Sequence, residues 1–133
     1  FRNQLSKDLP GTLQKVADTG LKFVETFNFS EELSLQVGTS SSDPTSLSKM
    51  LKDVGLSVSS MHSEIPVGDD KEKALRLAEA YDCKKVIWHG WPEDNRYQTL
   101  DGIKELAYIY NEANQFLKTN GLEFGLHNHW WEM

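Results

Sequence analysis

Apolar residues recur along the chain with two alternating periods. Stripes with the three-to-four-residue spacing of a buried helix face fall within residues 13–17, 47–54, 74–81 and 103–117. Short runs typical of strands fall between and after them, at residues 21–27, 56–62, 84–90 and 122–129. Because helical side chains share a face every three or four positions and strand side chains alternate, the chain predicts helices and strands in regular alternation.

The predicted strands begin near residues 21, 56, 84 and 122, at steps close to the length of one βα unit. Strands separated by helices form parallel sheets, which occur either as open doubly wound sheets or as (β/α)8 barrels. Neither GxGxxG nor GxxxxGK[ST] follows any of these strands, so the pattern disfavours a nucleotide-binding sheet. The chain has 133 residues, which is enough for one domain with its own core.

Histidines mark the carboxyl ends of the predicted strands. The four in the chain are His62, His89, His127 and His129, and Glu25 lies at the matching end of the first strand. One histidine at such a place is more often a hydrogen-bonded loop residue than a ligand. Ligands of parallel α/β folds bind at this edge of the sheet, however, so four histidines there predict a functional site.

The last predicted strand separates two kinds of side chain. Alternation puts Leu122, Phe124 and Leu126 on the face that packs under helices, and it puts Glu123, Gly125, His127 and His129 on the other face, toward a barrel interior. Two imidazoles on one face can hold a divalent metal or bind sugar hydroxyls. Tryptophans 88, 91, 130 and 131 lie at the same strand ends, where they serve either packing or stacking on a sugar ring.

Composition narrows the classes of partner. The net charge of −6 disfavours binding to nucleic-acid phosphates, and no apolar run approaches the roughly 20 residues of a membrane span. Cys83 is the single cysteine, so no intrachain disulfide forms. The first residues lack the apolar core of a signal peptide, which favours a cytoplasmic protein. Because the chain opens on Phe1, export after removal of a leader stays an alternative.

Three stretches resemble a known family: residues 1–25, GLSVSSMHSEIP (55–66) and GLEFGLHNHWWEM (121–133). They are similar to the xylose isomerase-like TIM barrels, the group of sugar phosphate isomerases and epimerases, and HNHWWE resembles that group's HNHxxE signature. The resemblance implies that residues 1–133 form one partial barrel domain. It would run from the end of barrel strand 1, at Phe1-Arg2, through strand 5.

The resemblance also implies a chemistry. Members move a proton beside a carbonyl through an enediolate, on a sugar or sugar phosphate, and many bind a divalent ion. We expect Mn, with Mg, Zn or Co as alternatives, held by His127 and Glu132. The residues expected to contact the substrate are Glu25, His62, Glu64, His89, Trp91, His129 and Trp130.

The chain also departs from the family pattern. A full barrel needs about 250 residues, and strands 6 to 8, with most of the family's ligands and one acid/base carboxylate, are not in this sequence. We therefore expect the isolated chain to be inactive or nearly so. Three alternatives stay open: a carbohydrate-binding or self-associating half-barrel that pairs with itself or with a missing half, a lyase or keto-sugar hydrolase or dehydratase of the same superfamily, and the related DNA-repair endonucleases, which the acidic charge disfavours.

Overall fold

The computed structural model describes residues 4, 7–27 and 44–130 of the chain. Strands and helices alternate through this part, as the hydrophobic periods predict. The elements are α2 (Leu9–Asp18), β1 (Phe23–Phe27), α4 (Pro44–Asp53), β2 (Ser57–His62), α5 (Asp70–Tyr81), β3 (Lys85–Trp88), the short 3-10 helix η1 (Asn95–Gln98), α6 (Leu100–Thr119) and β4 (Glu123–Leu126).

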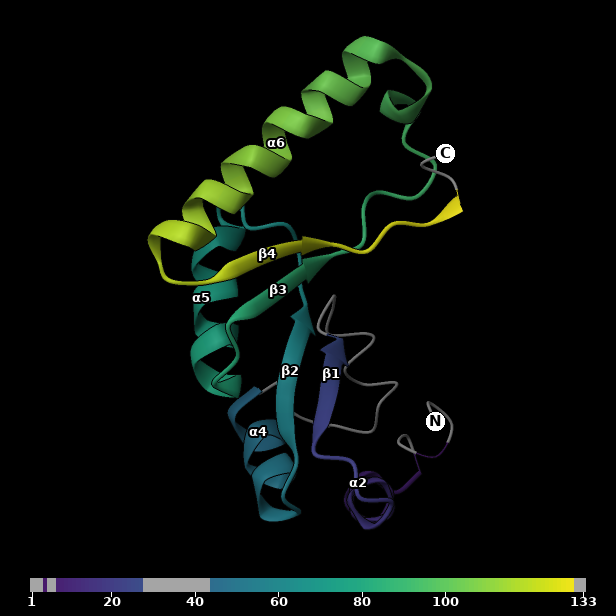
Figure 1. The fold of residues 1–133 in the computed structure, drawn as a ribbon, viewed down its shortest axis with the longest axis vertical. Helices are drawn as coiled ribbons and strands as arrows, with labels where there is room; N and C mark the ends of the chain where they lie inside the picture. Colours follow the sequence, from purple (N-terminus) through teal and green to yellow (C-terminus); the bar gives the residue numbers. More distant parts are fainter. Residues whose placement is uncertain (1–3, 5–6, 28–43, 131–133) are drawn as a thin grey trace.

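The four strands form one parallel sheet in the order β1-β2-β3-β4 (Figure 1). Helices α4 and α5 pack against β2, α5 also packs against β3, and α6 packs against β4. The predicted parallel α/β sheet is therefore confirmed. None of the helices in the described part of the chain combines the length and the apolar character that a membrane span requires.

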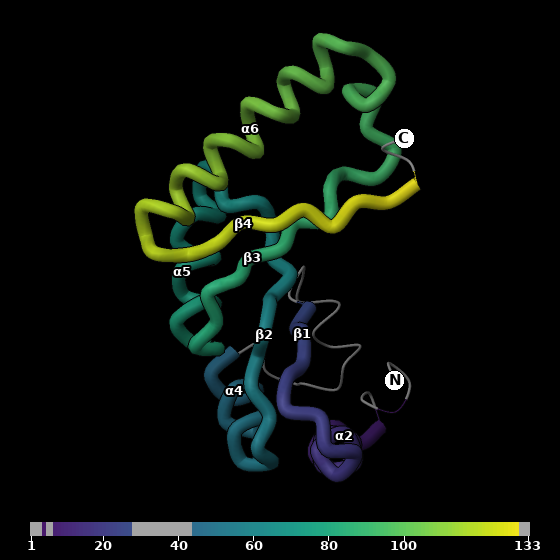
Figure 2. Tube along the Cα trace, viewed as in Figure 1, coloured from purple at the N-terminus to yellow at the C-terminus, as the bar shows by residue number. Residues whose placement is uncertain are grey.

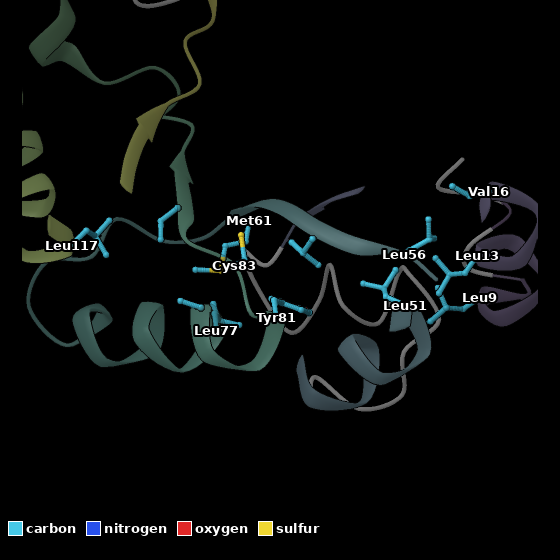
Figure 3. Close-up of a cluster of buried hydrophobic side chains, with 13 residues drawn as sticks. Leu9, Leu13, Val16, Leu51, Leu56, Met61, Leu77, Tyr81, Cys83 and Leu117 are labelled. Carbon is cyan, nitrogen blue, oxygen red and sulfur yellow. The ribbon is translucent and has the colours of Figure 1, made fainter. Parts of the chain in front are cut away.

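The main core lies between the helices and one face of the sheet (Figure 3). Leu51, Leu77 and Tyr81 of the helices meet Met61 and Val86 of the strands, and Leu117 of α6 extends the same cluster. These residues belong to the predicted apolar stripes or strands. Burying such side chains stabilises the fold by roughly 1.5–3 kcal/mol each, so this cluster holds α4, α5 and the end of α6 against the sheet.

Two positions predicted to be buried are exposed. Ile103 on α6 is 49% exposed and Leu126 at the end of β4 is 51% exposed. The first turns of α6 lie against η1, where Gly102 and Glu105 contact Arg96, and β4 is the outer strand of the described sheet. Periodicity identified the apolar face of each element correctly, but in this structure no described element covers these two positions.

The last two strands are shorter than predicted. β3 ends at Trp88 and β4 ends at Leu126, so His89, His127 and His129 follow the strands instead of lying within them. Gly90 has a φ of 78°, a conformation that takes the chain out of the ladder. One further bond, from the His127 N–H to the Trp88 carbonyl at 2.8 Å, keeps the segments after β3 and β4 adjacent (Figure 2).

The other face of the sheet carries side chains of a different kind. Alternation in β1 directs Phe23, Glu25 and Phe27 to this face, where both phenylalanines are exposed. Ile87 of β3 and Gly125 of β4 lie opposite each other on the same face. We call this the open face of the sheet, because no described helix packs on it.

Candidate functional site

The four histidines lie together at the carboxyl ends of the strands. The ring of His62 meets that of His127 at 5.2 Å between centroids, nearly perpendicular, and His127 stacks on His129 at 4.5 Å. His129 in turn lies 6.2 Å from His89. We call these four residues the histidine row. Their common location is as the sequence predicts, whereas their binding roles stay predictions.

Glu25 joins the row from β1. His62 Nε2 donates a hydrogen bond to Glu25 Oε1 at 2.9 Å, and Ser60 Oγ donates to Glu25 Oε2. Because Nε2 faces a carboxylate oxygen, it must carry the hydrogen of the neutral imidazole. Glu25 is therefore fixed by two neutral donors from the neighbouring strand.

His62 is the buried end of the row. Its side chain is 4% exposed, and the ring of Phe27 stacks on it at 5.4 Å. Burial lowers the pKa of His62, with smaller contributions from His127 and His129, although the Glu25 carboxylate acts in the opposite direction. A neutral imidazole at this place can donate to Glu25 and needs no compensating charge.

The other three members of the row are more exposed than His62. His89 and His129 are half-buried and His127 is exposed. Trp130, the last described residue, is 78% exposed. These side chains are open to a ligand, so their predicted contacts with a sugar are compatible with their positions.

Trp91 lies in an aromatic cluster that adjoins the histidine row through Trp88, whose ring meets that of His89 edge-on at 4.7 Å. The Trp91 ring is parallel to that of Tyr110 at 6.3 Å, contacts Trp88 edge-on at 5.1 Å, and has the Arg96 guanidinium 4.7 Å from its centroid. The backbone N–H of Trp91 also donates a hydrogen bond to the Tyr97 hydroxyl at 3.3 Å. These contacts favour the packing role that the sequence left open for this tryptophan.

Glu64 follows His62 by two residues and interacts with the start of helix α5. Its charge interacts with Lys73 and Asp70, both in the first turn of α5. Burial raises the pKa of Glu64 above its usual value, and this effect outweighs the attraction of Lys73. The charged groups near this predicted substrate contact are therefore those at the start of a helix.

The described residues do not by themselves fit a metal ion. No group of three His, Cys, Asp or Glu side chains within the described ranges is arranged to hold one. A metal–imidazole bond lies in the ring plane, and the rings of His127 and His129 are stacked within 10° of parallel, so these two cannot converge on one ion as they stand. Glu132, the second predicted ligand, and Trp131 lie outside the described residues.

Ser60 is a site residue that sequence reasoning missed. It lies two positions before His62 in β2, and its hydroxyl holds the second oxygen of Glu25. The available signal was the shared strand face of residues two apart. The contact also depends on a register shift between β1 and β2. The spacing of apolar residues does not reveal such a shift.

Three comparisons with known proteins bear on this arrangement. No family model and no curated protein matches the chain. Two solved structures of a sugar phosphate isomerase/epimerase from Parabacteroides distasonis ATCC 8503 are similar to it, both at 23% identity. The first has a TM-score of 0.70 over 96% of this chain and 48% of that one, and the second has 0.68 over 92% and 49%.

A xylose isomerase-like TIM barrel protein from Mycobacterium smegmatis, solved in complex with magnesium, has a TM-score of 0.53 at 14% identity. It is covered over 46% of its length by 91% of this chain. The chain thus spans about half the length of the solved structures that it matches. Its four parallel strands and their helices match roughly half of a xylose isomerase-like TIM barrel, which confirms the predicted fold class.

Proposed function

We propose that the chain forms the N-terminal half of a sugar isomerase/epimerase-like barrel and that Glu25 and the histidine row bind the sugar. One observation carries the proposal: these side chains come from the carboxyl ends of four adjacent parallel strands and meet there. In barrels built from βα units, substrates bind at this end. The likeness to structures of that class supports the same assignment.

The chemistry of the row suits a polyhydroxylated ligand. Neutral imidazoles donate and accept hydrogen bonds, and a carboxylate accepts them from hydroxyls. The half-buried His89 and His129 and the exposed His127 can each approach a hydroxyl group. The reaction proposed for the barrel is proton transfer at the carbon beside a carbonyl, through an enediolate.

We also propose a divalent ion, Mn before Mg, Zn or Co, as part of the complete site. His127 and Glu132 are the ligands proposed from this chain. Such an ion supplies stabilisation of negative charge on a carbonyl oxygen. Because the described residues bring no three ligands together, we propose that later barrel strands supply the remaining ligands.

A second proposal follows from the open face of the sheet. Phe23 is 64% exposed on this face, and the outer strands β1 and β4 have no neighbour beyond them in the described sheet. Exposed strand edges readily pair with further strands. A second half-barrel, from the same or another chain, would cover both features, and sedimentation of the 133-residue chain as a monomer at all concentrations would contradict this pairing.

The proposed function is tested by hydrogen exchange into a sugar. A barrel-length protein carrying this chain is incubated with Mn²⁺ and a ketohexose in D₂O, and NMR follows deuterium at the carbon beside the carbonyl. We expect incorporation with the barrel-length protein and almost none with residues 1–133 alone. His129→Ala should raise KM, whereas the control Lys104→Ala, on the exposed side of α6, should not. No incorporation with any ketohexose would contradict the proposal.

A further inference from the structure

The carboxylate of Glu25 is held at both oxygens by one neighbouring strand. Ser60 Oγ donates to Oε2, and His62 Nε2 donates to Oε1 at 2.9 Å. Both donors are buried, whereas the Glu25 side chain is 50% exposed. The two partners therefore fix the carboxylate from its buried side and leave its other side accessible to a ligand.

A β-bulge produces this arrangement. Val24 pairs with Val58, but the next residue, Glu25, pairs with Ser60, so one residue of β2 is skipped. The skipped Ser59 instead donates to the Val24 carbonyl at 3.2 Å. The shift places Ser60 opposite Glu25 and His62 opposite Phe27, whereas a regular ladder would pair Glu25 with Ser59. Bulges that re-aim one side chain are frequent beside active sites.

The hydrogen bonds leave Glu25 with unused acceptor capacity. Each carboxylate oxygen has two lone pairs, and each oxygen of Glu25 accepts one bond from these partners. Asp94, in the loop between β3 and η1, differs because the Arg96 guanidinium donates hydrogen bonds to both of its oxygens and lowers its pKa. The partner of Asp94 is therefore a cation, whereas the two partners of Glu25 named above are a hydroxyl and an imidazole.

We propose that Glu25 is the carboxylate that takes and returns the proton at the carbon beside the carbonyl, and that Ser60 and His62 are positioning residues that hold it. This inference rests on the proposed function. In the step, the C–H bond breaks and its proton passes to Glu25, while its electron pair forms the C=C bond of the enediolate and the carbonyl pair moves to oxygen. Return of the proton to the neighbouring carbon, with transfer of the hydroxyl proton between the two oxygens, yields the isomeric carbonyl without any oxidant.

The holding of Glu25 is tested in the 133-residue chain, independently of activity. ¹⁵N NMR at neutral pH reports which nitrogen of His62 carries the proton. We expect the Nε2–H form, with an N–H signal whose exchange with water becomes faster in Glu25→Gln and Ser60→Ala. Glu123→Gln, at the opposite end of the sheet, is the matched control. A His62 protonated at Nδ1 alone would overturn the positioning, whatever the barrel-length protein does.

The proton role is tested by deuterium exchange in the barrel-length protein. Glu25→Gln should lower the exchange rate at saturating ketohexose by about 100-fold or more. KM should change little, because the Gln amide oxygen can still accept a hydrogen bond from a sugar hydroxyl. Ser60→Ala should lower the same rate by about tenfold without changing KM, and Ser60→Thr, which restores a hydroxyl donor, should recover it. Glu123→Gln should leave both unchanged.

The outcomes separate the two proposals. If the wild-type protein exchanges hydrogen but Glu25→Gln changes KM alone, Glu25 binds the sugar and the proton role is overturned. If the wild-type protein does not exchange hydrogen with any ketohexose, the proposed function fails and the proton role fails with it, while the NMR result on the holding of Glu25 stands by itself.

Discussion

The side chain of Ile87 lies over Gly125 on the open face of the sheet, so closely that a Cβ at position 125 would be 2.7 Å from Ile87 Cδ1. The two residues pair across β3 and β4. His89 and His127 follow two residues later in the chain, just after the ends of β3 and β4, so this contact lies close to the histidine row. The small residue in β4 thus determines how closely the two strand ends approach.

Gly125→Ala should therefore destabilise the chain by about 1 kcal/mol, because the end of a flexible side chain must move. Ile87→Val removes the clashing carbon. In that background the alanine substitution should cost little or nothing, and urea unfolding of the four variants measures the coupling. Equal losses in both backgrounds would show that the contact is not the cause.

Asp94→Asn should weaken the anchoring of the loop between β3 and α6. Arg96 bonds both oxygens of Asp94, reaches Glu105 at 3.1 Å and covers Trp91. Loss of a charged hydrogen-bond partner costs about 1.5–3 kcal/mol. The matched control Asp53→Asn removes an exposed ion pair to Lys49 and should cost less than about 1 kcal/mol.

The loss in Asp94→Asn should also depend on pH. Hydrogen bonds from Arg96 lower the pKa of Asp94 in the folded chain, so the stabilisation is present above the carboxyl's unfolded pKa and is lost as the pH falls through the folded value. Urea unfolding should show that the difference in free energy of unfolding between wild type and Asp94→Asn is smaller below about pH 3.9 than near neutral pH. A difference that does not change with pH would contradict the role of the carboxylate.

Glu64→Gln should stabilise the chain at neutral pH. Burial raises the pKa of Glu64, so the folded chain binds this proton more tightly than the unfolded chain, and stability falls as the pH rises through the folded value. Melting temperatures of wild type and variant should converge in acid and separate near neutral pH. Glu72→Gln, at an exposed position of α5, should give no such gain, and a destabilised Glu64→Gln at neutral pH would contradict the account.

Leu117→Ala should be among the most destabilising substitutions in α6. Leu117 is fully buried in the cluster that joins α6 to the sheet, and removing such a side chain costs about 2–5 kcal/mol. Leu100→Ala, at an exposed position of the same helix, should change the free energy of unfolding by less than about 0.5 kcal/mol. Similar losses at both positions would contradict the assignment of the core.

The sequence predicted the alternating elements, the parallel sheet and the edge on which His62, His89, His127 and His129 lie, because each follows from hydrophobic period and from the direction of parallel strands. It could not predict the bulge that aligns Glu25 with Ser60, since an inserted residue only interrupts a period. Nor did it predict the exposure of Ile103 and Leu126, because a period identifies a face but not what covers it.

The measurement that tests the central claim most directly is a crystal structure of a barrel-length protein carrying this chain with a ketohexose bound. The account predicts sugar hydroxyls within hydrogen-bonding distance of Glu25 and of His129, on the open face at the carboxyl ends of the strands. A sugar bound instead at the opposite ends of the strands, beside Lys22 and Lys84, or on the helical face of the sheet, would contradict it.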